Sequence, residues 1–154
     1  MPLRILHIED DPEVVALVSR ALREVALVDT ADSLGAAQSR LSDVTAPAYD
    51  LLLVDLCLPD SHGIEAIEAL KAYRVPIIVI SNAASCSETL RGAAVAGADD
   101  FLIKGNVIPL ALVERVRFVH SKTHRATRRA LTAAAFEALK PYITYGSKPP
   151  FVAA

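Results

Sequence analysis

The feature that most constrains the fold is a regular alternation of short, mostly apolar runs with longer segments of helical periodicity. Runs of this length and composition are typical of strands covered on both faces of a sheet. The runs occupy residues 4–8, 26–31, 50–54, 76–80 and 100–103, of which 26–31 is the weakest candidate, and helix-period segments occupy 11–25, 32–44, 63–73, 85–97 and the stretch from 110 onward. Alternating strands and helices predict a parallel sheet with right-handed crossovers and helices on both faces.

Local signals support these boundaries. Asp32 or Ser33 can cap the second helix, and Gly97 can end the fourth. Five strands and five helices would be complete by about residue 121, so we expect a doubly wound α/β domain over 1–121 and a helical extension and tail over 122–154.

Length and composition are consistent with one globular domain. The chain has 154 residues, of which 53% are hydrophobic and 22% are charged, and this balance excludes disorder. No apolar stretch reaches the roughly 18 residues of a membrane span and no cleavable leader is present, so we expect a cytoplasmic protein. A net charge of −2 gives no general attraction to nucleic acid. Cys57 and Cys86 lack disulfide or metal-site spacing, and a redox role has no supporting motif.

Polar side chains follow four of the predicted strands. They are Glu9 and Asp10 after the first strand, Asp55 after the third, Ser81 after the fourth and Lys104 after the fifth. Because the carboxyl ends of parallel strands meet at one edge of the sheet, we expect these side chains to converge there.

This set of side chains permits a specific chemistry. Clustered carboxylates raise one another's pKa, and a hard divalent cation such as Mg²⁺ relieves the repulsion. At about 4 Å and an effective dielectric constant of about 20, the charge of Lys104 is worth roughly 4 kcal/mol, enough to keep it ionised and facing negative charge. A carboxylate beside Mg²⁺, a hydroxyl and an ammonium can attack phosphorus, so Asp55 is the candidate for an aspartyl phosphate.

The segments "HIEDD", "LLLVDLCLPDSHG", "PIIVISNA" and "GADDFLIKG" occur in this order. On these segments the chain, over about residues 3–121, resembles the receiver domains of bacterial two-component response regulators, in their Lys-Gly variant. The resemblance implies the flavodoxin-like receiver fold. It also implies that Glu9 and Asp10 bind Mg²⁺, with Asp10 the more direct ligand, while Asp11 falls outside the pair and can cap the following helix.

The same resemblance assigns further roles. Asp55 is the phosphoacceptor and a metal ligand, and Cys57 offers its backbone carbonyl to Mg²⁺. Ser81 and Lys104 complete the catalytic set with Asp55. Ser81 is also the switch hydroxyl, which moves inward on phosphorylation, and Phe101 is the aromatic switch residue that fills the vacated space.

Three positions depart from the commonest receiver pattern. Gly105 follows the lysine where proline is usual, so we expect a trans bond or a glycine-specific turn. Asn82 follows the switch hydroxyl where alanine or glycine is usual, and it can contact the phosphoryl group or obstruct water. Phe101 replaces the frequent tyrosine, so the switch would be read through packing alone.

These observations predict a single-domain response regulator. A histidine kinase or phosphotransfer protein would phosphorylate Asp55, the phosphoryl group would later be hydrolysed, and a downstream protein would read the change. We expect no turnover of a separate substrate. One alternative is a receiver module that binds proteins without phosphorylation. A second alternative is a phosphatase, which would need a substrate pocket and a general acid that the sequence does not reveal.

The remaining features of note are the C-terminal extension and two histidines. Residues 110–140 contain neither Gly nor Pro, so the last helix can continue to Pro141. It would carry an apolar stripe of Leu131, Ala135, Phe136 and Leu139. The stripe can fold back on its own domain or pair with a second copy or a partner; we do not expect DNA binding. His7 is interpreted as a packed strand residue, and His62 as a solvated loop residue.

Overall fold

The computed structural model describes residues 1–82, 87–106 and 109–139. Cys86, Pro141 and the tail segment "SKPPF" lie outside the described residues, as do the side chains of the predicted apolar stripe. The strands are β1 (Leu3–Ile8), β2 (Ala26–Ala31), β3 (Leu51–Val54), β4 (Cys57–Leu58), β5 (Ser61–His62), β6 (Ile77–Ile80) and β7 (Asp100–Leu102). The α-helices are α1 (Pro12–Leu22), α2 (Leu34–Leu41), α3 (Glu65–Leu70), α4 (Ser87–Ala96) and α5 (Pro109–Leu139).

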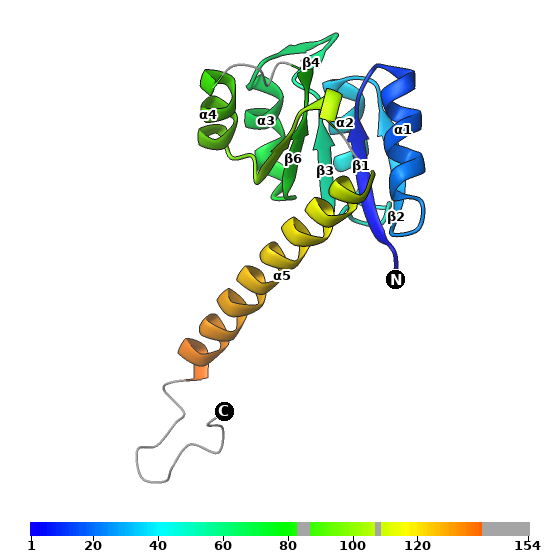
Figure 1. Cartoon of the computed structure of the whole chain (residues 1–154). Coiled ribbons are helices and arrows are strands. Elements are labelled where there is room, and N and C mark those ends of the chain that lie inside the picture. The colour runs from blue at the N-terminus through cyan, green and yellow to red at the C-terminus, as the bar shows by residue number, and fades with distance from the viewer. Residues whose placement is uncertain (83–86, 107–108, 140–154) are drawn as a thin grey trace, which may run out of the picture. The chain divides into compact units, whose positions relative to one another are not determined.

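Five of the strands form one parallel sheet in the order β2-β1-β3-β6-β7 (Figure 1). In terms of sheet strands alone this is the 2-1-3-4-5 order of flavodoxin-like folds, in which ligands bind at the carboxyl ends of the strands. The doubly wound α/β fold predicted from the sequence is therefore confirmed. The strand boundaries agree with those expected to within one residue.

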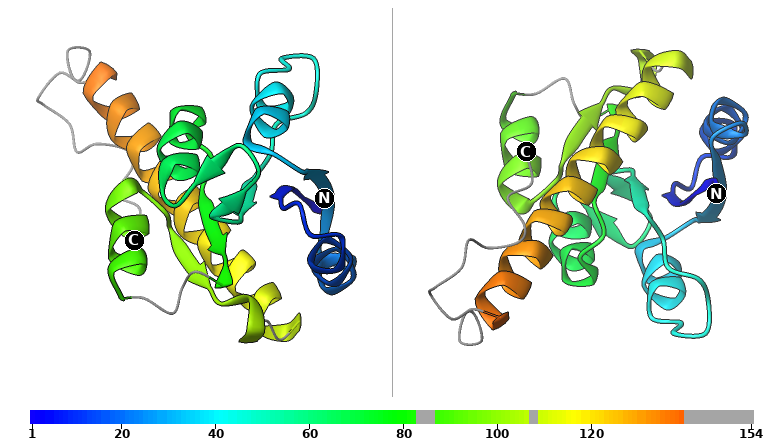
Figure 2. Two further views of the ribbon diagram at one scale, coloured as in Figure 1. Left: turned by 90° about the horizontal axis from the view of Figure 1, so that it is seen from above. Right: turned by 90° about the horizontal axis from the view of Figure 1, so that it is seen from below.

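Two apolar clusters hold the sheet between its helices. One cluster joins Leu6 and Ile8 of β1 to Ala37 of α2, and to residues of α3 and α4. The other joins Ile5 of β1 to Val18 of α1, and to residues of α5. Successive β1 residues thus face opposite layers, as strand geometry requires. In the views from above and below, α2 and α3 lie on one face of the sheet, and α1 and the first turns of α5 lie on the other (Figure 2).

Three of the helix ends have a clear local cause. Asp11 caps α1 and Ser33, one of the two candidates, caps α2 through a hydrogen bond from the Ala36 amide. Gly97 follows α4 with φ +112°, and its amide donates to the carbonyl of Ala93 at 3.1 Å. A left-handed glycine after the last helical residue is a common helix end.

One element was not expected from the sequence. The segment after β3 forms a short antiparallel hairpin, β4–β5, in which Cys57 pairs with His62 and Leu58 pairs with Ser61. Leu58 and Ser61 are buried, whereas Cys57 and His62 are exposed. Two-residue strands are too short to produce a periodic signal, which is why this segment reads as a loop.

The chain divides into two compact units, Met1–Ser121 and Lys122–Ala154. The first contains the sheet, and the last part of α5 belongs to the second. In the ranges that the structure describes, none of the helices combines the length and apolarity that crossing a bilayer would take.

Candidate functional site

The polar residues predicted to converge at one sheet edge do so, because sheet hydrogen bonding continues one residue beyond several strands. The amide of Glu9 donates to Ala31 at 2.9 Å, and the amide of Asp55 donates to Ile8 at 3.0 Å. The amide of Ser81 likewise donates to the carbonyl of Leu102 at 3.1 Å. These bonds hold the backbone of Glu9, Asp55 and Ser81 at the base of the site.

Both oxygens of the Asp55 carboxylate have a partner. Ser81 Oγ donates to Asp55 Oδ1 at 2.8 Å, and Lys104 Nζ donates to Oδ2 at 2.8 Å. Lys104 Nζ also lies 2.7 Å from Glu9 Oε2. The carboxylates of Glu9 and Asp55 are buried, and 12% of the Lys104 side chain is exposed. The ammonium thus bridges two buried carboxylates.

Asp10 brings a third carboxylate to this edge. One oxygen each of Glu9, Asp10 and Asp55 lie within 4.8 Å of one another, and Asp10 is exposed to solvent. Asp11 stands apart, because its Oδ1 accepts a 2.9 Å hydrogen bond from the Glu13 amide and caps α1. Of the three consecutive acids, two therefore face the cluster and the third serves the helix.

Burial and ion pairing shift the pKa values of Glu9 and Lys104. Burial raises the pKa of the Glu9 carboxyl, although the hydrogen bond from Lys104 opposes this effect. Desolvation alone would lower the pKa of Lys104, but its hydrogen bonds to Asp55 and Glu9 prevail and raise it. The lysine is therefore cationic throughout the physiological pH range.

The donor set suits a hard divalent cation. Three carboxylate oxygens at a solvent-accessible edge, two of them from buried side chains, provide negative charge in excess of the single lysine. Mg²⁺ prefers such oxygen ligands and retains water at its remaining positions. Cys57, two residues beyond Asp55, begins β4, and its thiol is exposed. A backbone carbonyl at that position would add an oxygen of the same kind.

The remaining predicted positions lie around the cluster. Phe101 in β7 is half-buried and packs against the apolar cluster on the α2, α3 and α4 side of the sheet. Asn82 is exposed and directly follows Ser81. The Lys104–Gly105 peptide bond is trans, in a short 3₁₀ turn that follows β7.

The two histidines of interest differ in environment. His7 is fully buried in β1, and neither ring nitrogen has a hydrogen-bond partner in the part of the chain that the structure describes. Burial, assisted by the charge of Lys104, lowers its pKa to about 4. His62 is exposed on β5, opposite Cys57. Both observations agree with the interpretation of His7 as a packed strand residue and of His62 as a solvated one.

Sequence reasoning missed one residue near the site. Asp60, at the tip of the β4–β5 hairpin, accepts hydrogen bonds from the amides of Leu34 at 2.8 Å and Gly35 at 2.9 Å. These amides belong to the first turn of α2, 25 or 26 positions away in the chain. A turn aspartate carries no sequence signal for such a distant partner.

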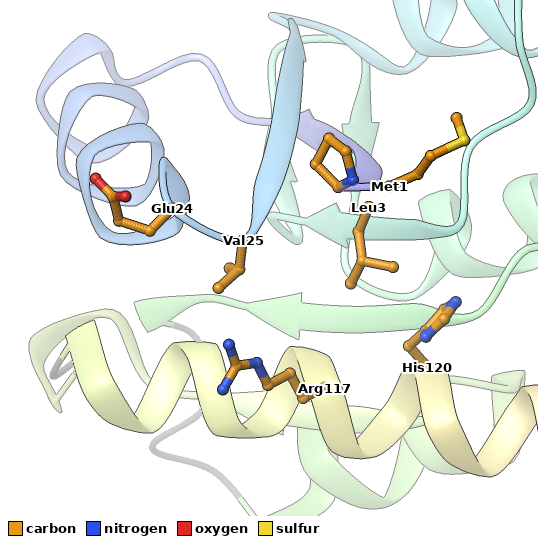
Figure 3. Close-up of a pocket in the computed structure, with 7 residues that line it drawn as sticks. Met1, Leu3, Glu24, Val25, Arg117 and His120 are labelled. Carbon is orange, nitrogen blue, oxygen red and sulfur yellow. The ribbon is translucent and has the colours of Figure 1, made fainter.

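The larger of two described cavities lies at the opposite end of the sheet. It measures about 490 Å³ and lies between the start of β1 and α5 (Figure 3). Its lining includes Leu3, Val25 and Arg117. A second cavity of about 210 Å³ reaches Lys104 and is lined mainly by α1 residues. The larger cavity cannot serve as a substrate pocket for Asp55, because Asp55 lies at the other end of the strands.

Curated relatives match much of the chain. The transcriptional regulatory protein PrrA of Mycobacterium tuberculosis is 36% identical over 121 residues, covering 74% of this chain and 48% of the relative. TcrA, a transcriptional regulatory protein of the same organism, is 32% identical over 104 residues, covering 66% of this chain and 40% of the relative. The chain thus spans about half the length of the curated relatives that it matches.

Solved structures share the fold. A CheY-like response regulator receiver domain from Methanospirillum hungatei JF-1 superposes with a TM-score of 0.73 at 24% identity, covering 82% of this chain and 99% of that one. The BeF3-activated DrrB receiver domain gives a TM-score of 0.66 at 27% identity, covering 77% and 97%. The family model for the response regulator receiver domain matches residues 5–117. This match spans most of the chain and every element of the acidic site, and the chain therefore belongs to the response regulator receiver domain family.

Proposed function

We propose that the chain is a Mg²⁺-dependent phosphoryl acceptor whose phosphorylated residue is Asp55. The observation that supports this most strongly is the position of the Asp55 carboxylate. One oxygen contacts the Ser81 hydroxyl and the other contacts the Lys104 ammonium, while one oxygen each of Glu9 and Asp10 lies within 4.8 Å of an Asp55 oxygen. Each of these groups can help to bind or stabilise a phosphoryl group at Asp55.

The reaction is a transfer between a nitrogen and an oxygen. An Asp55 oxygen attacks the phosphorus of a phosphohistidine, and the new O–P bond forms as the P–N bond breaks. The electron pair of the broken bond stays on the imidazole nitrogen, which takes up a proton. Later attack by water on phosphorus breaks the O–P bond and releases inorganic phosphate, restoring the Asp55 carboxylate.

Glu9, Asp10, Asp55 and the Cys57 carbonyl would hold Mg²⁺, which supplies electrostatic stabilisation of the phosphoryl oxygens. The protein's own contribution is charge and orientation. Lys104, freed from part of its contact with Asp55, can neutralise a second phosphoryl oxygen, and the Ser81 hydroxyl can donate to a third. A small cavity lined mainly by α1 residues also reaches Lys104.

The resulting signal would be conformational. Phosphorylation adds up to about two negative charges, which would draw Ser81 away from its present hydrogen bond. Phe101, half-buried beside this strand, could then move into the vacated space and alter the surface around β7. Such a change biases an existing equilibrium between two arrangements.

The expected partners are a histidine kinase or phosphotransfer protein upstream and a protein target downstream. The named relatives are transcriptional regulatory proteins, so the expectation that this chain does not bind DNA stays a prediction. The single-domain organisation, the cytoplasmic location and a homodimer through the C-terminal helix stay predictions as well.

A small-molecule phosphodonor tests the proposal directly. Incubation with acetyl phosphate and Mg²⁺ should add the mass of one phosphoryl group, as read by intact mass spectrometry, and EDTA should prevent it. Asp55→Asn should remove the modification. Asp43→Asn is the matched control, because Asp43 is exposed and the described contacts of its carboxylate are with Thr45 and Ala46 of its own turn. Modification that persists in Asp55→Asn would refute the assignment.

The alternative of a phosphorylation-independent binding module predicts a different result. In that case neither acetyl phosphate nor a kinase would modify the wild-type chain, while partner binding would be equal for wild type and Asp55→Asn. The complete set of Asp55, Ser81 and Lys104 contacts favours phosphoryl transfer, because a pure binding module has no need to keep a bridging lysine between buried carboxylates.

A further inference from the structure

The β4–β5 hairpin carries the residue whose carbonyl is expected to complete the metal site, and it must therefore be held in place. Its base is closed by a 3.1 Å hydrogen bond from the Gly63 amide to the Leu56 carbonyl. Its inner face is anchored by Leu58, which is 3% exposed and belongs to an apolar core cluster. These contacts hold the base and one face but not the exposed tip.

The tip is held by Asp60. The two carboxylate oxygens of Asp60 accept hydrogen bonds from two successive amides at the start of α2, at 2.8 and 2.9 Å. The first amides of a helix have no partner within the helix and lie at its positive end, so a carboxylate is the favoured acceptor there. The bonds from Gly35 and Leu34 lower the pKa of the Asp60 carboxyl, because they stabilise its ionised form.

Without Asp60, the start of α2 would still have a cap. Ser33 Oγ already accepts a hydrogen bond from the Ala36 amide at 3.2 Å. Unlike Ser33, Asp60 belongs to the hairpin, so its hydrogen bonds link the hairpin to the helix. The two residues cap the same helix, but only one of them links it to the segment that bears Cys57.

We propose that Asp60 is a positioning residue for the metal site: it holds the β4–β5 hairpin against α2 and would thereby fix the position of the Cys57 carbonyl relative to Glu9, Asp10 and Asp55. This inference rests on the proposed function. Residues that orient a ligand without touching the metal commonly affect metal affinity substantially. The link also joins the metal site mechanically to α2, a helix that contributes no side chain to the acidic cluster.

The experiment measures Mg²⁺ affinity without requiring phosphoryl transfer. Mg²⁺ is titrated into the ¹⁵N-labelled full chain, and the dissociation constant is taken from the amide shifts around Asp10 and Asp55. Asp60→Ala should raise this constant by about 10-fold. Asp60→Asn, which keeps one acceptor oxygen and the same shape, should raise it less. Ser33→Ala is the matched control and should leave it unchanged, although it also removes a cap from α2.

Activity provides a second readout. With acetyl phosphate, Asp60→Ala should need more Mg²⁺ for half-maximal phosphorylation and should reach the wild-type rate at saturating Mg²⁺. The inference is overturned if Asp60→Ala binds Mg²⁺ as tightly as wild type, or if Ser33→Ala weakens binding equally, which would indicate a general effect of α2 stability. Should Asp60→Ala fail to fold, the same comparison is made with Asp60→Asn. Failure of the wild type to accept a phosphoryl group would instead refute the proposed function.

Discussion

Lys104 Nζ lies 2.8 Å from Asp55 Oδ2 in a site where the aspartate is almost completely buried. The same ammonium lies 2.7 Å from Glu9 Oε2. Without a bound cation, one positive charge therefore compensates two buried negative charges. Removing one partner of a buried ion pair is costly, because the remaining charge is left without compensation.

Replacement of Lys104 by Met should therefore destabilise the metal-free protein by about 3–5 kcal/mol. The loss should be largest at neutral pH and smaller near pH 5, where Glu9, whose pKa is already raised by burial, takes up a proton more readily. Added Mg²⁺ should recover part of the stability by supplying the missing positive charge. Urea unfolding with EDTA or with Mg²⁺ measures both effects.

Lys71→Met is the control for this substitution. Lys71 is exposed, and its ammonium contacts the carbonyl of Gly97 at 3.3 Å and not a buried carboxylate. Its replacement should change the unfolding free energy by less than about 0.5 kcal/mol. Equal losses for the two variants would show that the bridge between Glu9 and Asp55 contributes nothing specific.

His7 should make the stability of the metal-free protein depend on pH. Its pKa is about 4 in the folded protein, against 6.5 ordinarily, because the ring is buried. Between these values the unfolded chain binds more protons than the folded one, so stability is complete above about pH 6.5 and falls as the pH drops toward 4. From pH 7.5 to 5.5 this group alone should cost about 1 kcal/mol.

The His7→Leu variant should lose this contribution, giving a flatter profile of unfolding free energy against pH in metal-free buffer. The comparison uses the slope and not the absolute stability, because the substitution also changes packing in β1. His62→Gln should keep the wild-type slope, since His62 is exposed. A His7→Leu profile parallel to that of wild type would contradict the burial of a neutral imidazole.

The strands and the convergence of acidic residues were predictable because they depend on local pattern and on topology. Runs such as 76–80 are apolar throughout, and a parallel sheet brings the residues that follow Ile8 and Val54 to the same edge. The topology thus placed Glu9 near Asp55 without any knowledge of side-chain geometry. The match to the receiver family, over residues 5–117, includes these same segments.

What the sequence could not predict depends on contacts between distant residues. The hydrogen bonds from Leu34 and Gly35 to Asp60 join segments with no shared periodicity. The hairpin that carries Asp60 has two-residue strands, which are too short for any pattern to reveal. The sequence also could not predict that neither ring nitrogen of the buried His7 has a hydrogen-bond partner among the described residues.

Two glycines near α4 should respond oppositely to alanine. Gly97 has φ +112°, a conformation that side chains rarely adopt, so Gly97→Ala should destabilise the protein by about 1–3 kcal/mol. Gly92 lies within α4, and a Cβ there would meet Ile64 Cγ2 at an ordinary 3.5 Å. Gly92→Ala should therefore be neutral or stabilise by up to about 1 kcal/mol. Thermal unfolding of both variants checks the contrast, and a stabilised Gly97→Ala would argue against the left-handed helix end.

Phe101 offers a direct view of the proposed switch, because the chain contains no tryptophan. The ring is half-buried against the core cluster on the α2, α3 and α4 side, so a larger aromatic side chain at its exposed edge can be accommodated at modest cost. The Phe101→Trp variant would carry the only tryptophan of the protein. Its fluorescence would then report on one position.

If phosphorylation draws Ser81 inward and Phe101 follows, the tryptophan of Phe101→Trp should become more buried on addition of acetyl phosphate and Mg²⁺. The expected signal is a shift of emission to shorter wavelength together with reduced quenching by iodide, since both depend on solvent contact of the ring. The same variant carrying Asp55→Asn should show neither change. A second control carries Ser81→Ala, which leaves the Asp55 carboxylate and Lys104 in place but removes the hydroxyl that would move. If phosphorylation shifts the emission spectrum when Ser81 is present but leaves it unchanged in the Ser81→Ala background, the movement of the aromatic ring depends on that hydroxyl. A spectral shift that persists in Ser81→Ala would mean that position 101 responds to the new charge by another route.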